Sequence, residues 1–245
     1  MPGLGYRYAD DARDHPFRGV IAPSPAAPAP KPRVFPWKAQ PSLNQLETGT
    51  CVGHGTKHWM LAAPIIDRPE AGPSPYAIYR AVVLLDEWEQ NDHEATTPDD
   101  ADLQFGTSVR AAMKWLKAQG YLKEYVRCYS ATQVAVAVRT LTPVLVGTNW
   151  SGHMSLPSTE GVVRYQPNFV IGGHCYLVHW FDQARGLFLC QNSWGSTWGV
   201  DHPSQRSLRG RRGFFYVPGE DFEGLVRDDG EAWTGVQTRR RRPAA

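Results

Sequence analysis

The hydrophobic pattern of this chain changes near residue 125, and that change limits the folds it can adopt. Before it, apolar residues recur at helical spacing in three segments, 51–63, 74–85 and 107–120. After it, β-branched and aromatic residues form short runs bounded by Gly, Pro, Asn or Asp, as strands do. Helices followed by antiparallel strands predict an α+β fold of two lobes, with a cleft where the lobes meet.

Local signals place the individual elements. Ser74 precedes Pro75, which is typical of a helix N-cap followed by the first helical position. Another helix is expected to begin at Thr107 or Ser108. We interpret 132–139 as a helix, although its valines alternate as they do in a strand. The expected strands are 143–150, 162–165, 175–181, 187–191 and 213–217.

The chain divides into four parts. Residues 1–36 form an N-terminal arm with six prolines between residues 22 and 36, a composition that favours extended polyproline II and builds no core. Residues 37–125 form the mainly helical lobe, and 126–230 form the β-rich lobe. Residues 231–245 are expected to be a basic C-terminal tail.

Size and charge exclude several classes of partner. At 245 residues and 42% hydrophobic side chains, the chain can bury a substantial core. A net charge of +2 gives no reason to expect nucleic acid or an anionic membrane as a partner. We interpret the terminal run Arg239–Arg242 as solvated and the acidic segment 86–102 as an exposed loop.

The expected location is cytoplasmic. No apolar run approaches the roughly 18 residues of a membrane span, and residues 1–7 lack the layout of a signal peptide. The four cysteines are therefore expected to be reduced thiols, with Cys128 and Cys190 as small buried hydrophobes. A place in a viral particle, a non-classical export route and the oligomeric state all stay open.

Cys51 and His174 are candidates for thiol chemistry. A free cysteine, with a pKa near about 8.5, is mostly protonated at neutral pH and needs help to act as a nucleophile. Cys51 follows a turn-like entry and precedes a helical stretch, so the positive end of a helix dipole favours its thiolate. His174 begins an expected strand of the other lobe, where its imidazolium can pair with that thiolate.

Three further residues supply the remaining parts of such a site. The side-chain carbonyl of Asn192 can orient the histidine, and Trp194 can shield that hydrogen bond from water. The amide of Gln45, with the backbone N–H of Cys51, can stabilise an oxyanion. Each residue alone is weak evidence in a chain with four cysteines and eight histidines, but their order together predicts thiolate attack on an amide.

These motifs resemble those of the papain-like cysteine peptidases, in which the order is Gln, Cys, His, Asn. The interval from Gln45 to Cys51 is that of the family, and Gly173–His174 is similar to its histidine motif. The segment Gln191–Gly199 resembles its asparagine motif almost residue for residue. Three further segments are similar to the family's closing strand, pocket strand and substrate-pairing loop: 213–217, 143–147 and 105–108.

The resemblance implies a helical left lobe and a right lobe resembling an antiparallel β-barrel. It also implies a cleft that binds an extended polypeptide substrate and hydrolyses it through an acyl-enzyme intermediate. Gly147 and Cys175 would then line the pocket for the residue that precedes the amino acid at the cleaved bond. Gly106 would offer backbone hydrogen bonds to substrate. No cofactor and no metal are expected.

The chain departs from the family pattern in two places. The family usually has Trp-Ala-Phe after the nucleophile, whereas here the sequence is Val52–Gly55, with two glycines that each cost about 1 kcal/mol in a helix. Either the helix begins late, or another backbone packs closely there. The left-lobe disulfides and the long prosegment also have no counterpart, so the chain resembles bacterial and viral members.

Other functions fit the same residues. A thiol-dependent amidase, deamidase or acyltransferase would use the same acyl-enzyme chemistry on another substrate. A catalytically inactive papain-like module that serves binding or structure is also open, favoured only by the altered segment after Cys51. His54 is interpreted as structural, and its i, i+4 spacing to His58 is weak evidence for zinc without an adjacent Glu.

Overall fold

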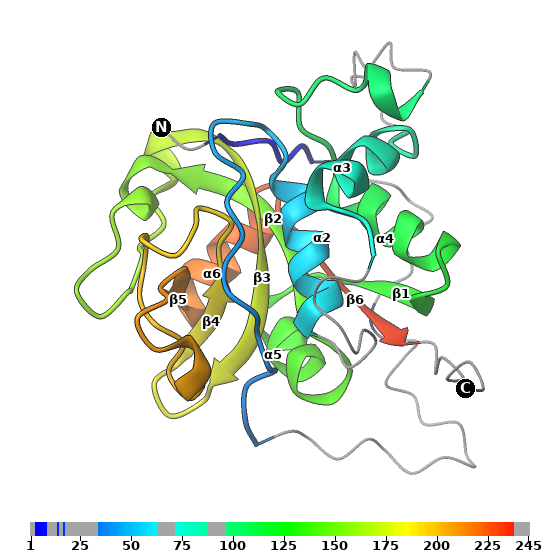
Figure 1. The fold of residues 1–245 in the computed structure, drawn as a ribbon. Coiled ribbons are helices and arrows are strands. Elements are labelled where there is room, and N and C mark those ends of the chain that lie inside the picture. The colour runs from blue at the N-terminus through cyan, green and yellow to red at the C-terminus, as the bar shows by residue number, and fades with distance from the viewer. Residues whose placement is uncertain are drawn as a thin grey trace, which may run out of the picture.

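The computed structural model describes residues 3–8, 14, 17, 34–62, 72–87 and 97–237. Within them, helices and one antiparallel sheet form two lobes (Figure 1). The helices are α2 (Cys51–Ala62), α3 (Pro75–Val83), α4 (Val109–Ala118), α5 (Ala131–Thr140) and α6 (Gly219–Arg227). Single 3₁₀ turns occur at η1 (Pro98–Asp100), η2 (Gly152–Ser155), η3 (Pro167–Phe169) and η4 (Arg206–Leu208).

The sheet has six strands in the order β1-β6-β2-β3-β4-β5 and is open rather than closed into a barrel. All of its strand pairs are antiparallel. Its strands are β1 (Leu122–Cys128), β2 (Val144–Ser151), β3 (Val170–Asp182), β4 (Leu187–Gln191), β5 (Phe214–Pro218) and β6 (Glu231–Gln237). Among the described helices, none is both long enough and apolar enough to span a bilayer.

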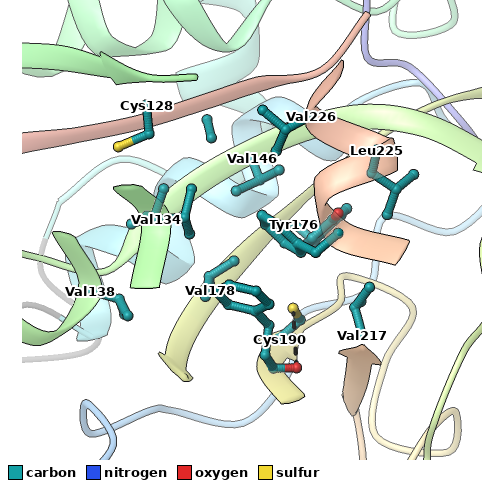
Figure 2. Close-up of a cluster of buried hydrophobic side chains, with 14 of the residues drawn as sticks. Cys128, Val134, Val138, Val146, Tyr176, Val178, Cys190, Val217, Leu225 and Val226 are labelled. Carbon is teal, nitrogen blue, oxygen red and sulfur yellow. Dashed lines mark hydrogen bonds between the residues drawn. The ribbon is translucent and has the colours of Figure 1, made fainter. Parts of the chain in front are cut away.

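The sheet separates two hydrophobic cores. Side chains alternate along a strand, so neighbours face opposite sides. In β3, Tyr176 and Val178 join α5 and α6 in one core, which Figure 2 shows in close-up. Cys175 and Leu177 face the other side, where they pack in the core that contains α2 and α4. Consequently β3 carries side chains to both lobes.

The structure explains the two glycines in the first turn of α2. The helix begins at Cys51, so it does not begin late. A Cβ on Gly53 would lie 2.3 Å from the carbonyl oxygen of Pro75, and one on Gly55 would lie 2.9 Å from a methyl group of Leu145. Glycine is therefore required because α3 and β2 pack closely against α2.

The helix signals are confirmed. The Ser74 hydroxyl accepts the Ala77 N–H at 3.1 Å, and Ser108 does the same for Ala111 at 3.1 Å. Both are N-caps that satisfy a free donor at the start of a helix. The segment interpreted as helix at 132–139 is α5.

Several expectations about the strands were incomplete or wrong. Residues 231–237 are not a tail, because β6 lies inside the sheet between β1 and β2. Residues 162–165 make only an isolated bridge from Val162 to Tyr216, and neither β1 nor α6 was expected. A boundary at 125 therefore cuts β1, and both lobes share one sheet. Arg239–Arg242 lies outside the described residues, as does most of the proline-rich run.

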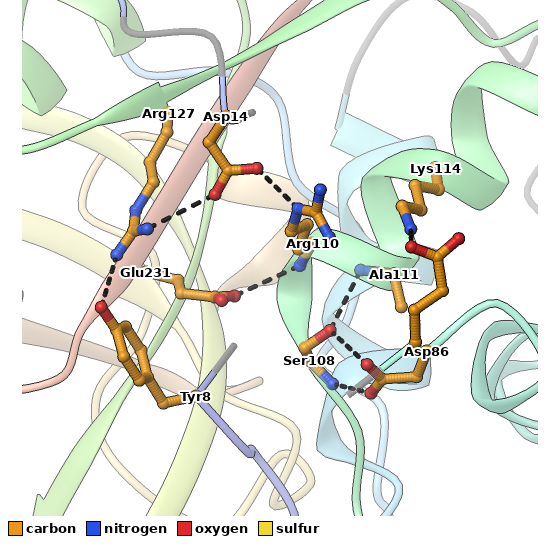
Figure 3. A network of polar contacts seen from close by, with 10 residues as sticks. Tyr8, Asp14, Asp86, Ser108, Arg110, Ala111, Lys114, Arg127 and Glu231 are labelled. Atoms are coloured by element: carbon orange, nitrogen blue, oxygen red, sulfur yellow. Dashed lines mark hydrogen bonds and ion pairs between the residues drawn. The ribbon is translucent and has the colours of Figure 1, made fainter. Parts of the chain in front are cut away.

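The N-terminal residues that the structure describes are packed against the body. The Phe17 side chain is buried in the core that contains α5 and α6, and its N–H donates to the Arg127 carbonyl. Asp14 forms ion pairs with Arg110 and Arg127, and Arg127 also donates to the Tyr8 hydroxyl at 3.3 Å (Figure 3). The beginning of the chain is thus attached to α4 and β1.

Candidate active site

Cys51 is the first residue of α2 and is fully buried. The N–H groups of a first helical turn lack partners within the helix, so this end carries partial positive charge and favours an anion. The structure therefore gives Cys51 the position expected of an activated thiol. Its sulfur also belongs to the core that contains Tyr6 and Cys175.

His174 and Asn192 come together from two neighbouring strands. His174 lies within β3, which extends further toward the N-terminus than expected, and Asn192 directly follows β4. The Nε2 atom of His174 lies 2.7 Å from Oδ1 of Asn192, and this oxygen also accepts the Ser193 N–H at 2.7 Å. An amide oxygen only accepts, so the imidazole carries its proton on Nε2. Nδ1 is left as a buried atom without a hydrogen bond partner.

Aromatic rings enclose this pair. The Trp194 ring lies 4.8 Å from the imidazole, centroid to centroid, and the Trp150 ring lies 4.9 Å from it in an edge-to-face arrangement. Such surroundings exclude water from the hydrogen bond between His174 and Asn192. Trp194 has the place expected of a shielding residue, whereas Trp150 of β2 was not identified from the sequence, because no local motif marks it.

Gln45 is held in a fixed orientation by Ser193. The Ser193 hydroxyl donates to Oε1 of Gln45 at 2.6 Å, and the Gln45 N–H donates to the Ser193 carbonyl at 2.9 Å. The side-chain amide nitrogen is thereby directed away from Ser193, and it donates to the carbonyls of Gly3 and Thr48 at 2.9 and 2.7 Å. Ser193 lies inside the asparagine motif, but the sequence alone gave it no role.

The chain's own residues Gly3–Tyr8, which we call the N-terminal segment, run between the 105–107 loop and β3. The Thr107 N–H donates to the Gly5 carbonyl at 2.9 Å, and the Arg7 N–H donates to the Thr107 carbonyl at 3.1 Å. On the other side, the Tyr6 N–H donates to the Gly173 carbonyl at 2.9 Å. The segment thus lies extended across the place where the sequence predicted a cleft for a polypeptide.

Gln45 and Cys51 contact different residues of the N-terminal segment. Gln45 binds the carbonyl of Gly3, whereas the backbone that hydrogen-bonds to the Cys51 sulfur is that of Gly5. Attack requires one carbonyl group to face both the nucleophile and the oxyanion donors. Here Gln45 and the Cys51 sulfur hydrogen-bond to the backbone of two different residues of the segment, Gly3 and Gly5.

Burial beneath this segment sets the charge state of the site. Burial raises the pKa of Cys51 to about 12, although hydrogen bonds from the backbone of Cys175 and Gly5 lower it. Burial also lowers the pKa of His174 to about 4, against an upward effect of the bond to Asn192. At neutral pH both groups are uncharged, so the expected thiolate–imidazolium pair is absent from this form of the molecule.

The three expected substrate-binding residues border the N-terminal segment. A Cβ on Gly106 would lie 2.0 Å from the Gly5 carbonyl oxygen, and one on Gly147 would lie 2.2 Å from the Tyr6 ring. Cys175 pairs with Gly147 in the sheet and packs in the same core as Tyr6. The Gly106 N–H donates to the Tyr79 hydroxyl, whereas the backbone of Thr107 exchanges hydrogen bonds with Gly5 and Arg7 of the segment.

The sequence placed Thr107 in the expected substrate-pairing loop but assigned the hydrogen bonds of that loop to Gly106. The Asp86 carboxylate accepts the Thr107 hydroxyl at 2.6 Å. It also accepts the Ser108 N–H at 2.8 Å, a contact shown in Figure 3. Asp86 was expected to begin an exposed acidic loop, but its carboxylate instead binds Thr107 and the N-cap residue Ser108 just before α4. Residues 88–96 of that loop lie outside the described residues.

The surroundings of the other cysteines and of His54 fit the structural role expected from the sequence. Cys128 and Cys190 are buried in the core that contains α5 and α6, and burial raises the pKa of both thiols. Nδ1 of His54 lies 3.0 Å from the Thr50 carbonyl oxygen within the same element. The part of the chain that the structure describes holds no group of three or more His, Cys, Asp or Glu side chains suited to a metal.

No family model and no curated protein matches this sequence. Solved structures of papain-like cysteine proteases do match its fold. Xylellain, a cysteine protease from Xylella fastidiosa, is 18% identical with a TM-score of 0.59, and the match covers 97% of both chains. A digestive procathepsin L2 from Tenebrio molitor is 17% identical with a TM-score of 0.60, covering 96% of this chain and 78% of that one.

Bromelain from Ananas comosus, solved with the inhibitor E64, is 12% identical with a TM-score of 0.53. The match covers 82% of this chain and 94% of bromelain. At these identities the likeness establishes a two-lobed papain-like fold and no more.

Proposed function

We propose that this protein is a cysteine peptidase that hydrolyses peptide bonds through an acyl-enzyme. The observation that carries the proposal is the hydrogen bond of 2.7 Å from His174 Nε2 to Asn192, which leaves Nδ1 available to exchange a proton with a reacting group. The backbone of Cys175, the residue after His174, hydrogen-bonds to the sulfur of Cys51 at the start of α2, which supports Cys51 as the nucleophile. Gln45 contributes a side-chain donor held by Ser193.

In the proposed reaction, the Cys51 thiolate attacks the carbonyl carbon of a bound peptide and forms a carbon–sulfur bond. The electron pair displaced from the carbonyl moves onto its oxygen, which accepts hydrogen bonds from Gln45 and the Cys51 N–H. The protonated Nδ1 of His174 gives its proton to the leaving amine as the carbon–nitrogen bond breaks. His174 then takes a proton from water, the water attacks the thioester, and the thiolate leaves.

The N-terminal segment must leave before this reaction can begin. It uses the donor of Gln45, covers the sulfur of Cys51 and hydrogen-bonds to Gly173. An extended chain is accommodated in this way, which supports a polypeptide as the substrate. Removal of the segment admits water and substrate, and solvation favours the charged forms of Cys51 and His174.

A single substitution in the full-length chain tests this proposal. A Cβ on Gly5 would lie 1.8 Å from the carbonyl oxygen of Gly49, so Gly5→Ala displaces the N-terminal segment. We expect this variant to hydrolyse fluorescein-labelled casein at least tenfold faster than the wild type. Gly219→Ala is the matched control, because its Cβ would meet only an ordinary contact at 3.5 Å.

Cys51→Ala in the Gly5→Ala chain must abolish the hydrolysis. If the Gly5→Ala protein is folded and cleaves no peptide, an amidase or acyltransferase acting on other substrates, or an inactive binding module, replaces this proposal. Assays with cell-wall fragments and with amine acceptors then separate the two enzyme classes.

A further inference from the structure

The side chain of Tyr6 occupies a pocket that fits it closely. Its ring faces Gly147, where any Cβ would lie 2.2 Å from Cδ2, and Gly173, where a Cβ would lie 3.0 Å from Cδ1. Two residues without side chains therefore make the space for an aromatic ring. Tyr6 is only 6% exposed, and its ring packs in the core that contains Cys175 and Leu145.

The inner end of this pocket recognises the hydroxyl group. Tyr6 donates a hydrogen bond of 3.0 Å to the backbone carbonyl of Asp229, in the turn between α6 and β6. Asp229 has a φ of 60°, a conformation that few residues other than glycine adopt. Burial and the nearby carboxylate of Glu231 raise the pKa of Tyr6, which keeps its hydroxyl protonated and able to donate.

The turn that carries this acceptor is braced on both sides. The Asn149 side-chain amide donates to the Asp228 carbonyl at 2.8 Å, and the Asp228 N–H donates to the Gly224 carbonyl at 2.9 Å. A Cβ on Gly230 would lie 2.2 Å from the Leu225 carbonyl oxygen, so the turn packs directly on α6. The Asp229 carbonyl is thus a fixed acceptor rather than one that adapts to its occupant.

We propose that this pocket selects tyrosine in polypeptide substrates, and that the side chain of Tyr6 occupies it in place of a substrate tyrosine. The claim rests on the proposed peptidase function. Phenylalanine fills the ring space but does not form the hydrogen bond to the Asp229 carbonyl, whereas leucine also leaves part of the space empty. A site built around a hydroxyl group discriminates against a side chain that lacks it.

A basic side chain is the competing occupant, because Glu231 lies near the pocket. However, Glu231 is fully buried, and its carboxylate accepts the Arg110 N–H at 3.2 Å, in the first turn of α4. The N-terminal end of α4 therefore already stabilises the negative charge of Glu231. A lysine or arginine would have to give up its hydration in an apolar pocket, which is unfavourable.

The test uses the full chain with Gly5→Ala, which vacates the pocket. Fluorogenic peptides that differ only at the residue preceding the cleaved amino acid would carry Tyr, Phe, Leu or Arg. We expect kcat/KM to be about five- to tenfold higher for Tyr than for Phe, the effect of one hydrogen bond, and lower still for Leu and Arg. Gly147→Ala should reduce cleavage of the Tyr peptide at least tenfold by filling the ring space.

A binding measurement tests the selectivity of the pocket independently of peptide cleavage. A fluorescent synthetic peptide of residues 1–8 is titrated against the Gly5→Ala, Cys51→Ala protein, together with analogues that have Phe or Leu in place of Tyr6. Weaker binding of both analogues supports the pocket even if no peptide is cleaved, in which case the proposed function alone fails. Equal binding of the three peptides, or cleavage that favours Phe, Leu or Arg, overturns the inference and leaves the peptidase proposal intact.

Discussion

Two of the buried histidines that take no part in the proposed reaction, His58 and His179, make the fold sensitive to acid. His179 of β3 donates from Nε2 to the Gln191 side-chain oxygen at 2.9 Å, and its Nδ1 has no partner. His58 of α2 accepts the Leu43 N–H at 3.0 Å. Burial lowers the pKa of His179 to about 3, and it lowers the pKa of His58 well below the usual value. Both are therefore neutral in the folded protein.

Proton linkage gives the size of the change in folding stability with pH. In the unfolded chain each histidine has a pKa of about 6.5, so at pH 5 the unfolded state binds a proton that the folded state does not. For His179 this stabilises the unfolded state by about 2 kcal/mol at pH 5 relative to pH 8, and His58 changes stability in the same direction. A typical domain is held folded by roughly 5–15 kcal/mol, so even the effect of His179 alone is measurable. Stability is complete above pH 6.5 and is lost as the pH falls below it.

Urea unfolding between pH 8 and pH 5, followed by tryptophan fluorescence, measures this loss. The variant His179→Gln removes one titrating group, and we expect the decrease from pH 8 to pH 5 to be about 2 kcal/mol smaller than in the wild type. Any change in stability caused by the substitution itself is recorded at pH 8, where neither state binds the proton. An identical decrease in variant and wild type would refute the reasoning.

Three other substitutions test the account. Ser193→Ala removes the hydroxyl that orients Gln45, so in the Gly5→Ala protein we expect kcat to decrease about tenfold, with a smaller change in KM; equal changes in both would contradict this positioning role. Gly53→Ala forces a Cβ against α3 and should lower the free energy of unfolding by about 2 kcal/mol in urea titrations, and an unchanged midpoint would disprove the close packing. Asp14→Asn weakens the ion pairs that attach the beginning of the chain, so Cys51 should react faster with iodoacetamide, and an unchanged rate would argue against this attachment (Figure 3).

Sequence reasoning succeeded where the signal is local. Cys51 begins a helix, and His174 and Asn192 form the expected hydrogen bond, because each belongs to a short motif whose residues determine the turn or strand around it. Ser74 and Ser108 were found for the same reason, since an N-cap is read from a few neighbouring residues.

It failed where the structure depends on partners distant in sequence. β6 pairs with β1 and β2, more than 80 positions away, and its Glu231 and Gly235 conceal the strand pattern. The sequence showed the two glycines of α2 but could not tell a late helix start from close packing. The N-terminal segment was also beyond prediction, because its position depends on glycines brought together by the fold, such as Gly147 and Gly173.

The most direct test of the central claim is the rate at which iodoacetamide modifies Cys51 from pH 5 to pH 9, measured site by site with mass spectrometry. In the full-length Gly5→Ala protein we expect fast modification of Cys51 that persists well below pH 8 and is lost with His174→Ala. The wild type should react slowly, because the N-terminal segment covers the sulfur. If Cys51 in the Gly5→Ala protein reacts no faster than Cys128 or Cys190, displacing the segment creates no thiolate–imidazolium pair, and the account is contradicted.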